Sequence, residues 1–426
     1  MKKLLIISPH FAPKNAADMH RVRLSLPYYE ENGWLPTVVC VDHRYYEMVD
    51  DPLMLESIPK HIKIHLVKAF PKKWTSKVGL GSLALRSYFF YKRYVDQLLK
   101  KEHFDLIFFS TTEFPLCALG SHWKRKFNIP YIIDMQDPWH TEYYQNKPKA
   151  ERPPKYWFSY RLNKYLEPIA MAAVSGIISV SDEYIKVLVH RYPEVKKIPV
   201  AVITFPAAVK DLEIAEANKK TLATPLLTDN SINLVYVGRG GHDLKQAAML
   251  LFNAFSSRLA ERPDLFSSIK FYFIGTSYAP KGTGLSTIKP IADTIGISEY
   301  VHEQTDRIPY FETLSYLNNA DGLIILGSDD PGYTASKIYP YILSKKPLLA
   351  IFNLKSSAAT IIRDCNAGSL ANISDNNQSE AVVSDFLDSI VQQSNISSQT
   401  NWENFSAYSA KSLTQEQCVL FNQAVS

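Results

Sequence analysis

The chain has 426 residues, which at the usual size of roughly 150 residues per domain predicts two or three domains. Hydrophobic residues make up 46% and charged residues 21%, which excludes wholesale disorder and a collagen-like chain. The 47 Lys and Arg exceed the 42 Asp and Glu by only five, too mild an excess for a dedicated nucleic-acid binder, so we expect no nucleic-acid partner.

The first segment, MKKLLIISPHFAP, starts basic and turns apolar, but its apolar run stops at Ile7. This run is too short for the core of a signal peptide, and no run approaches the roughly 20 residues of a membrane span. We therefore interpret residues 3–7 as a first buried strand. The four cysteines are far apart and form no CxxC pair, which is typical of a reduced, cytoplasmic protein without a structural zinc site.

Short apolar runs then alternate with longer amphipathic stretches along the whole chain. The runs are rich in Ile, Val, Leu and Phe and lack strict polar alternation, as strands buried on both faces of a parallel sheet do. Helical patterns lie between them, for example at residues 19–32, 245–260 and 311–319. This repetition predicts an α/β protein with two Rossmann-like, doubly wound parallel sheets facing across a cleft. The predicted strands are residues 3–7, 36–41, 62–67, 106–109, 131–134, 177–180, 200–203, 233–237, 271–274, 322–326 and 347–351.

Residues 206–231 interrupt this alternation of apolar and amphipathic stretches, because they are polar and carry two prolines. We place a linker there, between a first domain at 1–205 and a second at 232–400. Residues 401–426 are expected to form a helical tail that packs back towards the first domain. Parallel sheets bind ligands at the carboxyl ends of their strands, so the informative residues should follow strands directly.

A glycine-rich turn follows the predicted strand at 233–237 and opens a helix. It contains Arg239 between glycines, and Lys245 lies in the first turn of the helix. The helix dipole opposes a cation at this end by roughly 0.3–1 kcal/mol, so two cations there make sense if an anion sits between them. The turn predicts a phosphate or diphosphate site; a glycine-rich turn with two solvated basic side chains is the alternative.

A second polar loop follows the predicted strand at 322–326. It offers carboxylates that can accept hydrogen bonds from hydroxyls, a glycine that lets backbone amides approach a ligand, and caps for the next helix. These residues are Asp329, Asp330, Gly332, Thr334 and Ser336. Lys337 again places a cation in a first helical turn. An acidic turn that only caps a helix is the alternative interpretation.

Together the two motifs resemble the donor half of GT-B glycosyltransferases, specifically the retaining enzymes of the family 4 type. The N-terminal half agrees in motif order. SPHFAPKNAADMHRVRLSLPYYEENGWLPTVVCVD resembles the family's first strand, loop and Arg-bearing helix, PYIIDMQDPWH its DPW segment, and AVSGIISVSDEYIKVL a later strand. The resemblance spans most of the chain. It implies a hexosyltransferase-like enzyme that moves a sugar from a nucleotide-diphosphate-sugar donor to an acceptor hydroxyl, in polysaccharide, lipopolysaccharide or glycolipid assembly.

The resemblance also implies roles for individual residues. Arg239 and Lys245 match the basic pair that contacts the donor diphosphate and stabilises the charge that builds there, and we treat them as catalytic. Other donor-binding residues are Gly238, Gly240, Gly275, Thr276, Arg307, Ile308, Asp329, Asp330, Gly332, Tyr333, Thr334, Ser336 and Lys337. The acceptor-side residues are Phe11, Asn15, His20, Arg21, Asp137, Trp139 and His140.

The implied reaction retains the anomeric configuration, with the departing phosphate as the base. No DxD follows an apolar strand and no His cluster has metal-ligand spacing, so we expect no metal and no cofactor besides the donor. The family's second glutamate, which binds the ribose, is replaced by Pro340, so Ser336, Lys337 or Tyr341 would have to substitute. The first loop lacks the family's glycine pair, and FDLIFFSTTEF, which contains Glu113, lacks a common histidine.

Residues 72–101 mix eight Lys and Arg with six aromatic residues, and Asp96 is their one acidic residue. Basic and interfacial aromatic side chains together can dock a protein on an anionic lipid surface. This pattern indicates peripheral contact with the inner face of a membrane; an amphipathic helix with a solvated basic face is the alternative.

Two other functions remain open on the same architecture. A nucleotide-sugar epimerase would need acid–base pairs that the sequence does not present convincingly. A catalytically degenerate GT-B protein that binds a nucleotide sugar or scaffolds a partner would fit the proline at position 340.

Overall fold

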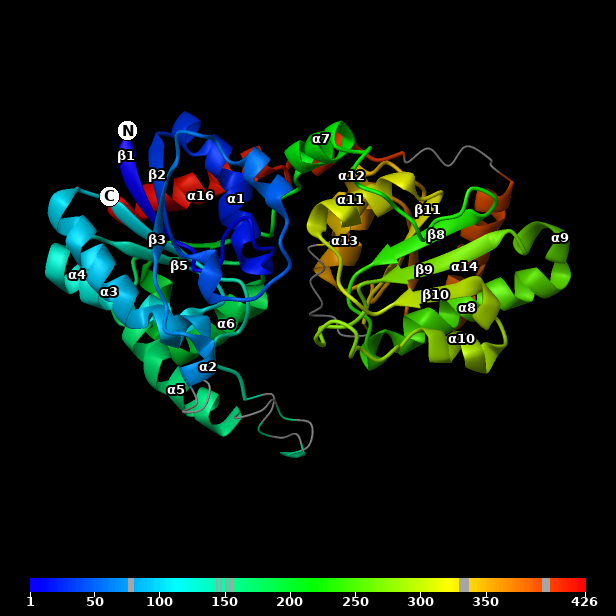
Figure 1. Ribbon diagram of the computed structural model, residues 1–426, viewed down its shortest axis with the longest axis horizontal. Helices are drawn as coiled ribbons and strands as arrows, with labels where there is room; N and C mark the ends of the chain where they lie inside the picture. The colour runs from blue at the N-terminus through cyan, green and yellow to red at the C-terminus, as the bar shows by residue number, and fades with distance from the viewer. Residues whose placement is uncertain are drawn as a thin grey trace. The chain divides into compact units, whose positions relative to one another are not determined.

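The computed structural model describes residues 1–75, 80–142, 156–328, 337–392 and 399–426, together with residues 145, 148, 149 and 152. The chain forms two compact units, each an α/β domain (Figure 1). Unit 1 comprises Met1–Pro206 and Ala410–Ser426, and unit 2 comprises Ala207–Ser409. Unit 2 is therefore inserted between two separate pieces of unit 1.

Unit 1 is built on a seven-stranded parallel sheet with the order β3-β2-β1-β4-β5-β6-β7. Its central strands are buried along almost their whole length, which explains their continuous apolar sequences. The strands are β1 (Lys2–Ile7), β2 (Trp34–Val41), β3 (Lys63–Val67), β4 (Leu106–Ser110), β5 (Tyr131–Met135), β6 (Gly176–Ser179) and β7 (Val200–Val202). The helices are α1 (His20–Ser25), α2 (Lys72–Thr75), α3 (Leu83–Lys101), α4 (Ala118–Phe127), α5 (Tyr156–Met171), α6 (Asp182–Arg191) and α16 (Ala410–Val425).

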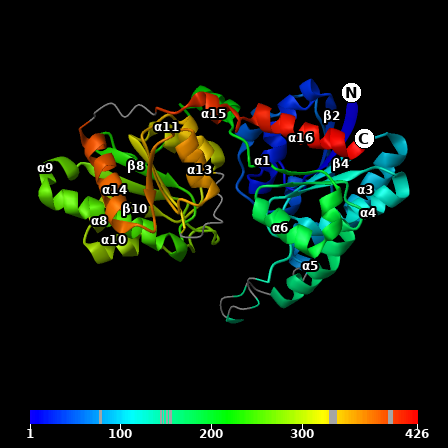
Figure 2. The same ribbon diagram turned by 180° about the vertical axis from the view of Figure 1, so that it is seen from behind.

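Both faces of this sheet are covered by helices, with α4 on one face and α16 on the other. Successive side chains of a strand point to opposite faces, and β4 shows the result. Phe109 stacks on Trp123 of α4 with ring centres 5.8 Å apart, whereas Phe108 contacts Phe421 of α16 at 5.0 Å. Figure 2 shows α16 running beside α1. The last helix of the chain is thus part of the core of unit 1.

Unit 2 is built on a six-stranded parallel sheet with the order β10-β9-β8-β11-β12-β13. Its strands are β8 (Ile232–Val237), β9 (Ile269–Ile274), β10 (Val301–Gln304), β11 (Gly322–Leu326), β12 (Leu348–Phe352) and β13 (Ser369–Asn372). Its helices are α7 (Val209–Ala217), α8 (Lys245–Glu261), α9 (Pro263–Phe266), α10 (Lys289–Ile295), α11 (Tyr310–Asn319), α12 (Ile338–Leu343), α13 (Ser357–Asp364), α14 (Asn376–Val391) and α15 (Trp402–Ser406).

The boundary between the units differs from the linker placed at 206–231. From Ala207 onwards that segment belongs to unit 2 and contains α7. The chain passes between the two units twice, at residues 206–207 and 409–410. These two segments are hydrogen-bonded near the boundary, since the Ala207 N–H donates to the Tyr408 carbonyl at 2.8 Å. Of the predicted tail, residues 401–409 belong to unit 2 and Ala410–Ser426 to unit 1.

Each sheet has one point where the strand order changes direction. In unit 1 it lies between β1 and β4, and in unit 2 between β8 and β11. At such a switch point the connections leave in opposite directions, and the crevice at the carboxyl ends of the strands binds ligands. The segments that follow β1, β4, β8 and β11 are therefore where a site is expected.

Candidate functional site

The glycine-rich turn of unit 2 joins β8 to α8 and has no room for side chains at two positions. A Cβ on Gly240 would lie 2.4 Å from Thr287 Oγ1. A Cβ on Gly241 would lie 2.5 Å from Asp243 Oδ1, and the φ of Gly241 is +150°. Both contacts are closer than packed atoms approach, so only glycine fits there.

Lys337 reaches this turn from the segment that follows β11, the other strand at the switch point. Its Nζ donates a hydrogen bond to Tyr236 Oη at 2.5 Å and lies 4.4 Å from the centre of that ring. A Cβ on Gly238 would be 3.1 Å from the same Nζ, so the glycine makes room for the ammonium group. Burial lowers the pKa of Lys337 to about 7, and the positive charges of Arg239 and Arg307 lower it too.

Two arginines surround this lysine. Arg239 forms a two-point ion pair with Asp243, with Nη1–Oδ1 at 2.9 Å and Nη2–Oδ2 at 2.5 Å. Arg307 lies over the ring of Tyr278, with its Cζ 4.6 Å from the ring centre. Three cations therefore converge on the turn, and Asp243 balances part of their charge. A bound diphosphate would neutralise such a group, which we call the cation cluster: Arg239, Arg307 and Lys337.

Lys245 lies at the start of the helix that follows the glycine-rich turn, as the sequence predicts. It is the first residue of α8 and its side chain is exposed. The main electrostatic effects on Lys337 come from Arg239, Asp243 and Arg307. The structure thus groups Arg239 with Lys337 and Arg307 rather than with Lys245.

The segment after β9 closes the other side of the glycine-rich turn. Gly275 has a φ of +73°, a left-handed conformation that favours glycine, and the Thr276 carbonyl accepts the Gly240 N–H at 2.8 Å. Thr276 Oγ1 donates to Glu303 Oε1 at 2.7 Å, and Glu303 also accepts the backbone N–H groups of residues 287–289. Glu303 therefore fixes this loop, a role that the sequence analysis missed.

In unit 1 a histidine and two carboxylates meet where β1 and β4 end. His10 Nδ1 lies 3.1 Å from Asp18 Oδ2 and 3.2 Å from Oδ1, and His10 Nε2 lies 3.9 Å from Glu113 Oε1. Burial alone would lower the pKa of His10, but the hydrogen bond to Asp18 and the two negative charges raise it. The sequence analysis did not single out His10 or Asp18. The one signal that could have identified His10 and Asp18 is their position beside the switch point of unit 1.

Four of the seven residues predicted on the acceptor side are buried: Phe11, Arg21, Trp139 and His140. Arg21 is fully buried and donates from Nε to Asp134 Oδ2 at 2.6 Å, while its Nη atoms donate to the carbonyls of Ile203 and Thr204. It ties α1 to the carboxyl ends of β5 and β7. The sequence analysis assigned Arg21 to the acceptor side, but the buried Asp134 carboxylate holds it inside.

The other acceptor-side residues differ in exposure. Trp139 donates from Nε1 to Asn163 at 3.2 Å and stacks on Phe114, and burial lowers the pKa of His140. Asn15 and His20 are partly exposed and contact each other at 3.2 Å. Asp137 is exposed at the surface. Its pKa is raised mainly because the nearby protein removes part of its hydration, and secondly by the negative charge of Asp18.

Residues 59–204 match the model of Glycosyltransferase Family 4, which covers most of unit 1 beyond its first two strands. Three solved structures are similar to the whole chain at low identity. The complex of Anabaena HepE with UDP and glucose has a TM-score of 0.60 at 14% identity, covering 99% of this chain and 100% of that one.

The N-terminal domain of Candida albicans trehalose-6-phosphate phosphatase has a TM-score of 0.60 at 14% identity, with 99% and 97% covered. The chain has the GT-B fold. A variant of S. aureus TarM in complex with Fondaparinux, alpha-GlcNAc-glycerol and UDP is also similar, with a TM-score of 0.59 at 10% identity and 99% and 100% covered. No curated protein matches the sequence. The predicted GT-B fold and the resemblance to family 4-type glycosyltransferases are thereby confirmed.

The second donor loop of this GT-B protein falls largely outside the described residues. That applies to Asp329, Asp330, Gly332, Tyr333, Thr334 and Ser336. Of the residues considered for the ribose, Tyr341 is fully buried and bonds the backbone of Val237 through its hydroxyl, and Lys337 belongs to the cation cluster. Ile308 is partly buried against the core of unit 2. Pro340 lies within α12.

The predicted lipid-facing segment presents exposed aromatic side chains on unit 1. The exposed fractions are 74% for Trp74 and 57% for Phe89, and Phe70, just before the predicted segment, is 46% exposed. Phe70 and Phe89 both contact Phe90, with ring centres 4.9 and 6.2 Å apart. The basic residues around them are exposed as well: Lys68, Lys72, Lys73, Lys92 and Arg93. We call this set the aromatic–basic surface.

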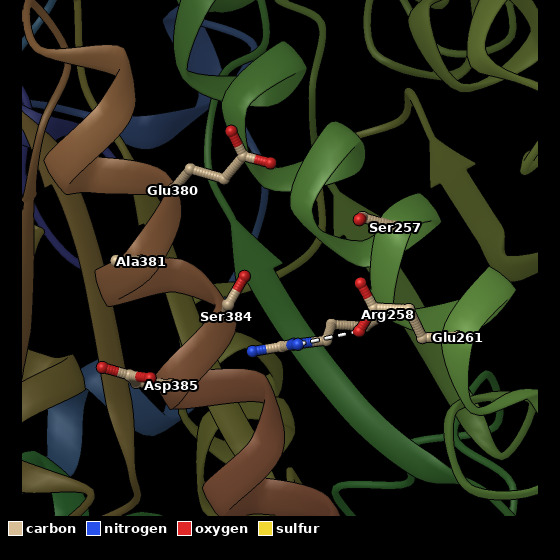
Figure 3. Close-up of a pocket in the computed structure, with 7 residues that line it drawn as sticks. All are labelled: Ser257, Arg258, Glu261, Glu380, Ala381, Ser384 and Asp385. Carbon is tan, nitrogen blue, oxygen red and sulfur yellow. Dashed lines mark hydrogen bonds and ion pairs between the residues drawn. The ribbon is translucent and has the colours of Figure 1, made fainter.

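A shallow groove of about 360 Å³ lies between α8 and α14 of the GT-B fold (Figure 3). Arg258 spans it, with one nitrogen 2.9 Å from Glu261 and another 2.9 Å from Asp388. The groove is at the carboxyl end of α8, roughly 20 Å of helix away from the glycine-rich turn, so we assign it no part in the site. Within the described part of the chain, no helix is long and apolar enough to span a bilayer, and no group of His, Cys, Asp and Glu could hold a metal ion.

Proposed function

We propose that the protein is a glycosyltransferase that uses a nucleotide-diphosphate sugar as its donor and unit 2 as its donor-binding domain. The observation that carries this proposal is the cation cluster at the switch point of unit 2, where Lys337 is held against Tyr236 and beside Gly238. The match of residues 59–204 to Glycosyltransferase Family 4 supports the same class of reaction. Similar folds with bound UDP make UDP-sugars the first donors to test.

In this reaction the diphosphate accumulates negative charge as the bond to the sugar breaks. Cations held in place before the reaction stabilise that charge more in the transition state than in the ground state, which lowers the barrier. Arg239 and Lys337 would carry this role. The ion pair of Arg239 with Asp243 keeps the guanidinium oriented before the donor arrives.

We further propose that transfer retains the anomeric configuration, needs no metal ion, and serves polysaccharide, lipopolysaccharide or glycolipid assembly. The family 4 resemblance supports retention and the kind of pathway, and the lack of a DxD after an apolar strand and of a His cluster with metal-ligand spacing supports metal independence. Proton NMR of the first product would give the anomeric configuration, and activity unchanged by EDTA is expected. An inverted product or full loss of activity in EDTA, restored by a divalent cation, would overturn the corresponding part.

The donor is found by thermal shift against UDP-, GDP-, ADP- and TDP-sugars. A ligand at 100 times its Kd stabilises the folded state by about 2.7 kcal/mol, which shifts the melting temperature measurably. Product analysis with the stabilising donor then separates the alternatives. Nucleoside diphosphate released together with a glycosylated acceptor supports a transferase, an altered sugar on the intact nucleotide indicates an epimerase, and binding without turnover indicates a degenerate GT-B protein.

We also propose that the aromatic–basic surface docks unit 1 on an anionic membrane, on the cytoplasmic side, so that a lipid-linked acceptor can reach the enzyme. Exposed Trp and Phe side chains insert at the lipid interface, and lysines around them attract anionic headgroups. We expect sedimentation with phosphatidylglycerol vesicles but not with phosphatidylcholine vesicles.

The double variant Trp74→Ala/Phe89→Ala should abolish this sedimentation. Leu285→Ala is the matched control, because Leu285 is an 83% exposed apolar residue of unit 2 outside this surface. Equal sedimentation of the double variant and the wild type would show that the aromatic–basic surface does not dock the protein on the vesicles.

A further inference from the structure

One carboxylate holds both walls of the space beside Gly240 in the glycine-rich turn. A Cβ on Gly240 would lie 2.4 Å from Thr287 Oγ1 and 3.1 Å from Thr276 Cβ, so these two threonines form the walls. Glu303 lies on β10, the strand next to β9 at the edge of the sheet (Figure 1). Its Oε1 accepts hydrogen bonds from Thr276 Oγ1 at 2.7 Å and from the Thr287 N–H at 3.0 Å.

The other oxygen of Glu303 fixes the start of α10. It accepts the backbone N–H groups of Ile288 at 3.0 Å and of Lys289 at 2.7 Å. Hydrogen bonds to an ionised acceptor are shorter and stronger than those between neutral groups. One carboxylate therefore cross-links the two ends of the segment that runs from β9 to α10.

The glycine-rich turn is hydrogen-bonded to this segment through its backbone. The Gly238 N–H donates to the Ile274 carbonyl at 2.9 Å, and the Gly240 N–H donates to the Thr276 carbonyl at 2.8 Å. These bonds continue the parallel pairing of β8 and β9 past the ends of the two strands. Because the turn is paired with residues 274–276, a side chain that fixes Thr276 also fixes Gly240.

The cation cluster depends on the same turn. Arg239 lies between the two hydrogen-bonded glycines, and Lys337 Nζ lies 3.1 Å from the place of a Cβ on Gly238. Misplacing a group that positions a substrate by about 1 Å can cost about a hundredfold in rate. A carboxylate is suited to hold N–H groups and unsuited to contact a diphosphate, so Glu303 would act on the donor through the turn.

We propose that Glu303 is a positioning residue of the donor site: it holds Thr276 and Thr287 so that the glycine-rich turn and its arginine are placed for the donor diphosphate. The inference rests on the proposed function for the identity of the ligand. A glutamine has one acceptor oxygen, and its amide nitrogen would face N–H donors. Glu303→Gln should therefore lose the hydrogen bonds of one of the two carboxylate oxygens.

The first test needs no ligand. The chain has 16 glycines, so the full protein labelled with ¹⁵N-glycine gives few amide signals, and the Gly240 signal is assigned by its loss in Gly240→Ala. Glu303→Gln should displace this signal. Asp321→Asn is the matched control and should leave it in place, because Asp321 also accepts a backbone N–H, that of Asn233 at 2.7 Å, but at the opposite end of β8.

The second test measures UDP binding by calorimetry at a temperature where the variants are folded. The Kd should rise about tenfold in Glu303→Gln and stay at the wild-type value in Asp321→Asn. Thr276→Val removes the hydroxyl donor and keeps the shape, so it should also raise the Kd. The double variant should bind more tightly than the product of the two single effects predicts. Should Glu303→Gln fail to fold, Thr276→Val must displace the Gly240 signal and raise the Kd on its own.

A role of Glu303 in stability alone would lower the melting temperature of Glu303→Gln but leave the Gly240 signal and the Kd unchanged, and that result would overturn the proposal. Fully multiplicative effects of the two changes would overturn it as well. Failure of the proposed function looks different. UDP would then not bind the wild type, while Glu303→Gln would still displace the Gly240 signal, which would refute the donor assignment and leave the hold of Glu303 on the turn standing.

Discussion

Lys337 donates a hydrogen bond to Tyr236 at 2.5 Å although 101 residues separate them in the chain. The contact joins the segment after β11 to the end of β8 at the switch point of unit 2. It also holds an ammonium group in partly buried surroundings beside two arginines, where charge is unfavourable until an anion arrives. The lysine is thus prepared to gain a proton when a diphosphate binds.

The first prediction concerns pH. Because the pKa of Lys337 is about 7 without ligand and rises when an anion binds, UDP affinity should fall as the pH increases above 7, by up to about tenfold per pH unit. Isothermal titration calorimetry in buffers of different ionisation enthalpy would show proton uptake on binding. In the Lys337→Met variant, the affinity for UDP should be lower than in the wild type and should not show the pH dependence that comes from protonation of Lys337. Lys337→Arg, which keeps its charge at all these pH values, should lose the pH dependence but retain binding.

The stability of the free protein should change with pH in the opposite sense. Between pH 7 and the ordinary pKa of lysine, the folded state binds fewer protons at Lys337 than the unfolded state does. Stability should therefore rise with pH across this window, and the Lys337→Met variant should lack that contribution. Urea unfolding at several pH values, compared between the two proteins, measures it.

The second prediction separates two residues that the sequence analysis treated as a pair. Arg239→Ala should reduce kcat by about 10²–10³, because it removes a charge fixed in the cation cluster. Lys245→Ala should have a much smaller effect, since its exposed charge is screened by solvent. Steady-state kinetics of the two variants measures both effects on kcat. A larger loss of kcat in Lys245→Ala than in Arg239→Ala would contradict the cation cluster as defined.

The third prediction tests the close packing of the glycine-rich turn. Gly240→Ala should weaken UDP binding, because its Cβ would lie 2.4 Å from Thr287 Oγ1. Thr287→Ala removes that atom, so the double variant should recover part of the affinity, limited by the remaining 3.1 Å contact with the Thr276 Cβ. Affinity measured by calorimetry for both single variants and the double variant completes the cycle. Strictly additive effects would contradict the proposed contact.

The fourth prediction concerns Arg21. Arg21→Met should lower the free energy of unfolding by about 3–5 kcal/mol, because it leaves the buried Asp134 carboxylate without its ion-pair partner. Denaturant unfolding measures this loss. At temperatures where the variant is folded, its KM for acceptor should match the wild type, in contrast to the role first assigned to this arginine. A raised KM with unchanged stability would reverse that conclusion.

The central strands of both sheets could be read from the sequence because they are buried on both faces. The two strands that were missed, β10 and β13, are the edges of the unit 2 sheet. Their sequences, VHEQ and SLAN, are short and largely polar, as edge strands that face solvent can be. Apolar periodicity therefore carries no signal for them.

The site was harder to predict than the fold because it depends on which side chains meet. Arg239 and Lys245 are close in sequence, yet the cation whose pKa Arg239 lowers is Lys337, which comes from the segment after β11. In unit 1 the pattern did not distinguish Arg21, which is buried against Asp134, from His10, which keeps a path to solvent. Proximity to a strand end singled out Arg239, Arg307 and Lys337 as separate candidates but did not show that these side chains meet.

The packing of α16 on unit 1 determines when that unit can be completed during synthesis. Phe421 packs against Trp34 and Phe108, and Gln417 bonds the side chains of Ser25 and Tyr29. A nascent chain therefore lacks this part of unit 1 until residues 410–425 have been translated, whereas the inserted unit 2 is complete earlier. Removal of α16 would expose the side chains of the unit 1 sheet that it covers, such as Phe108.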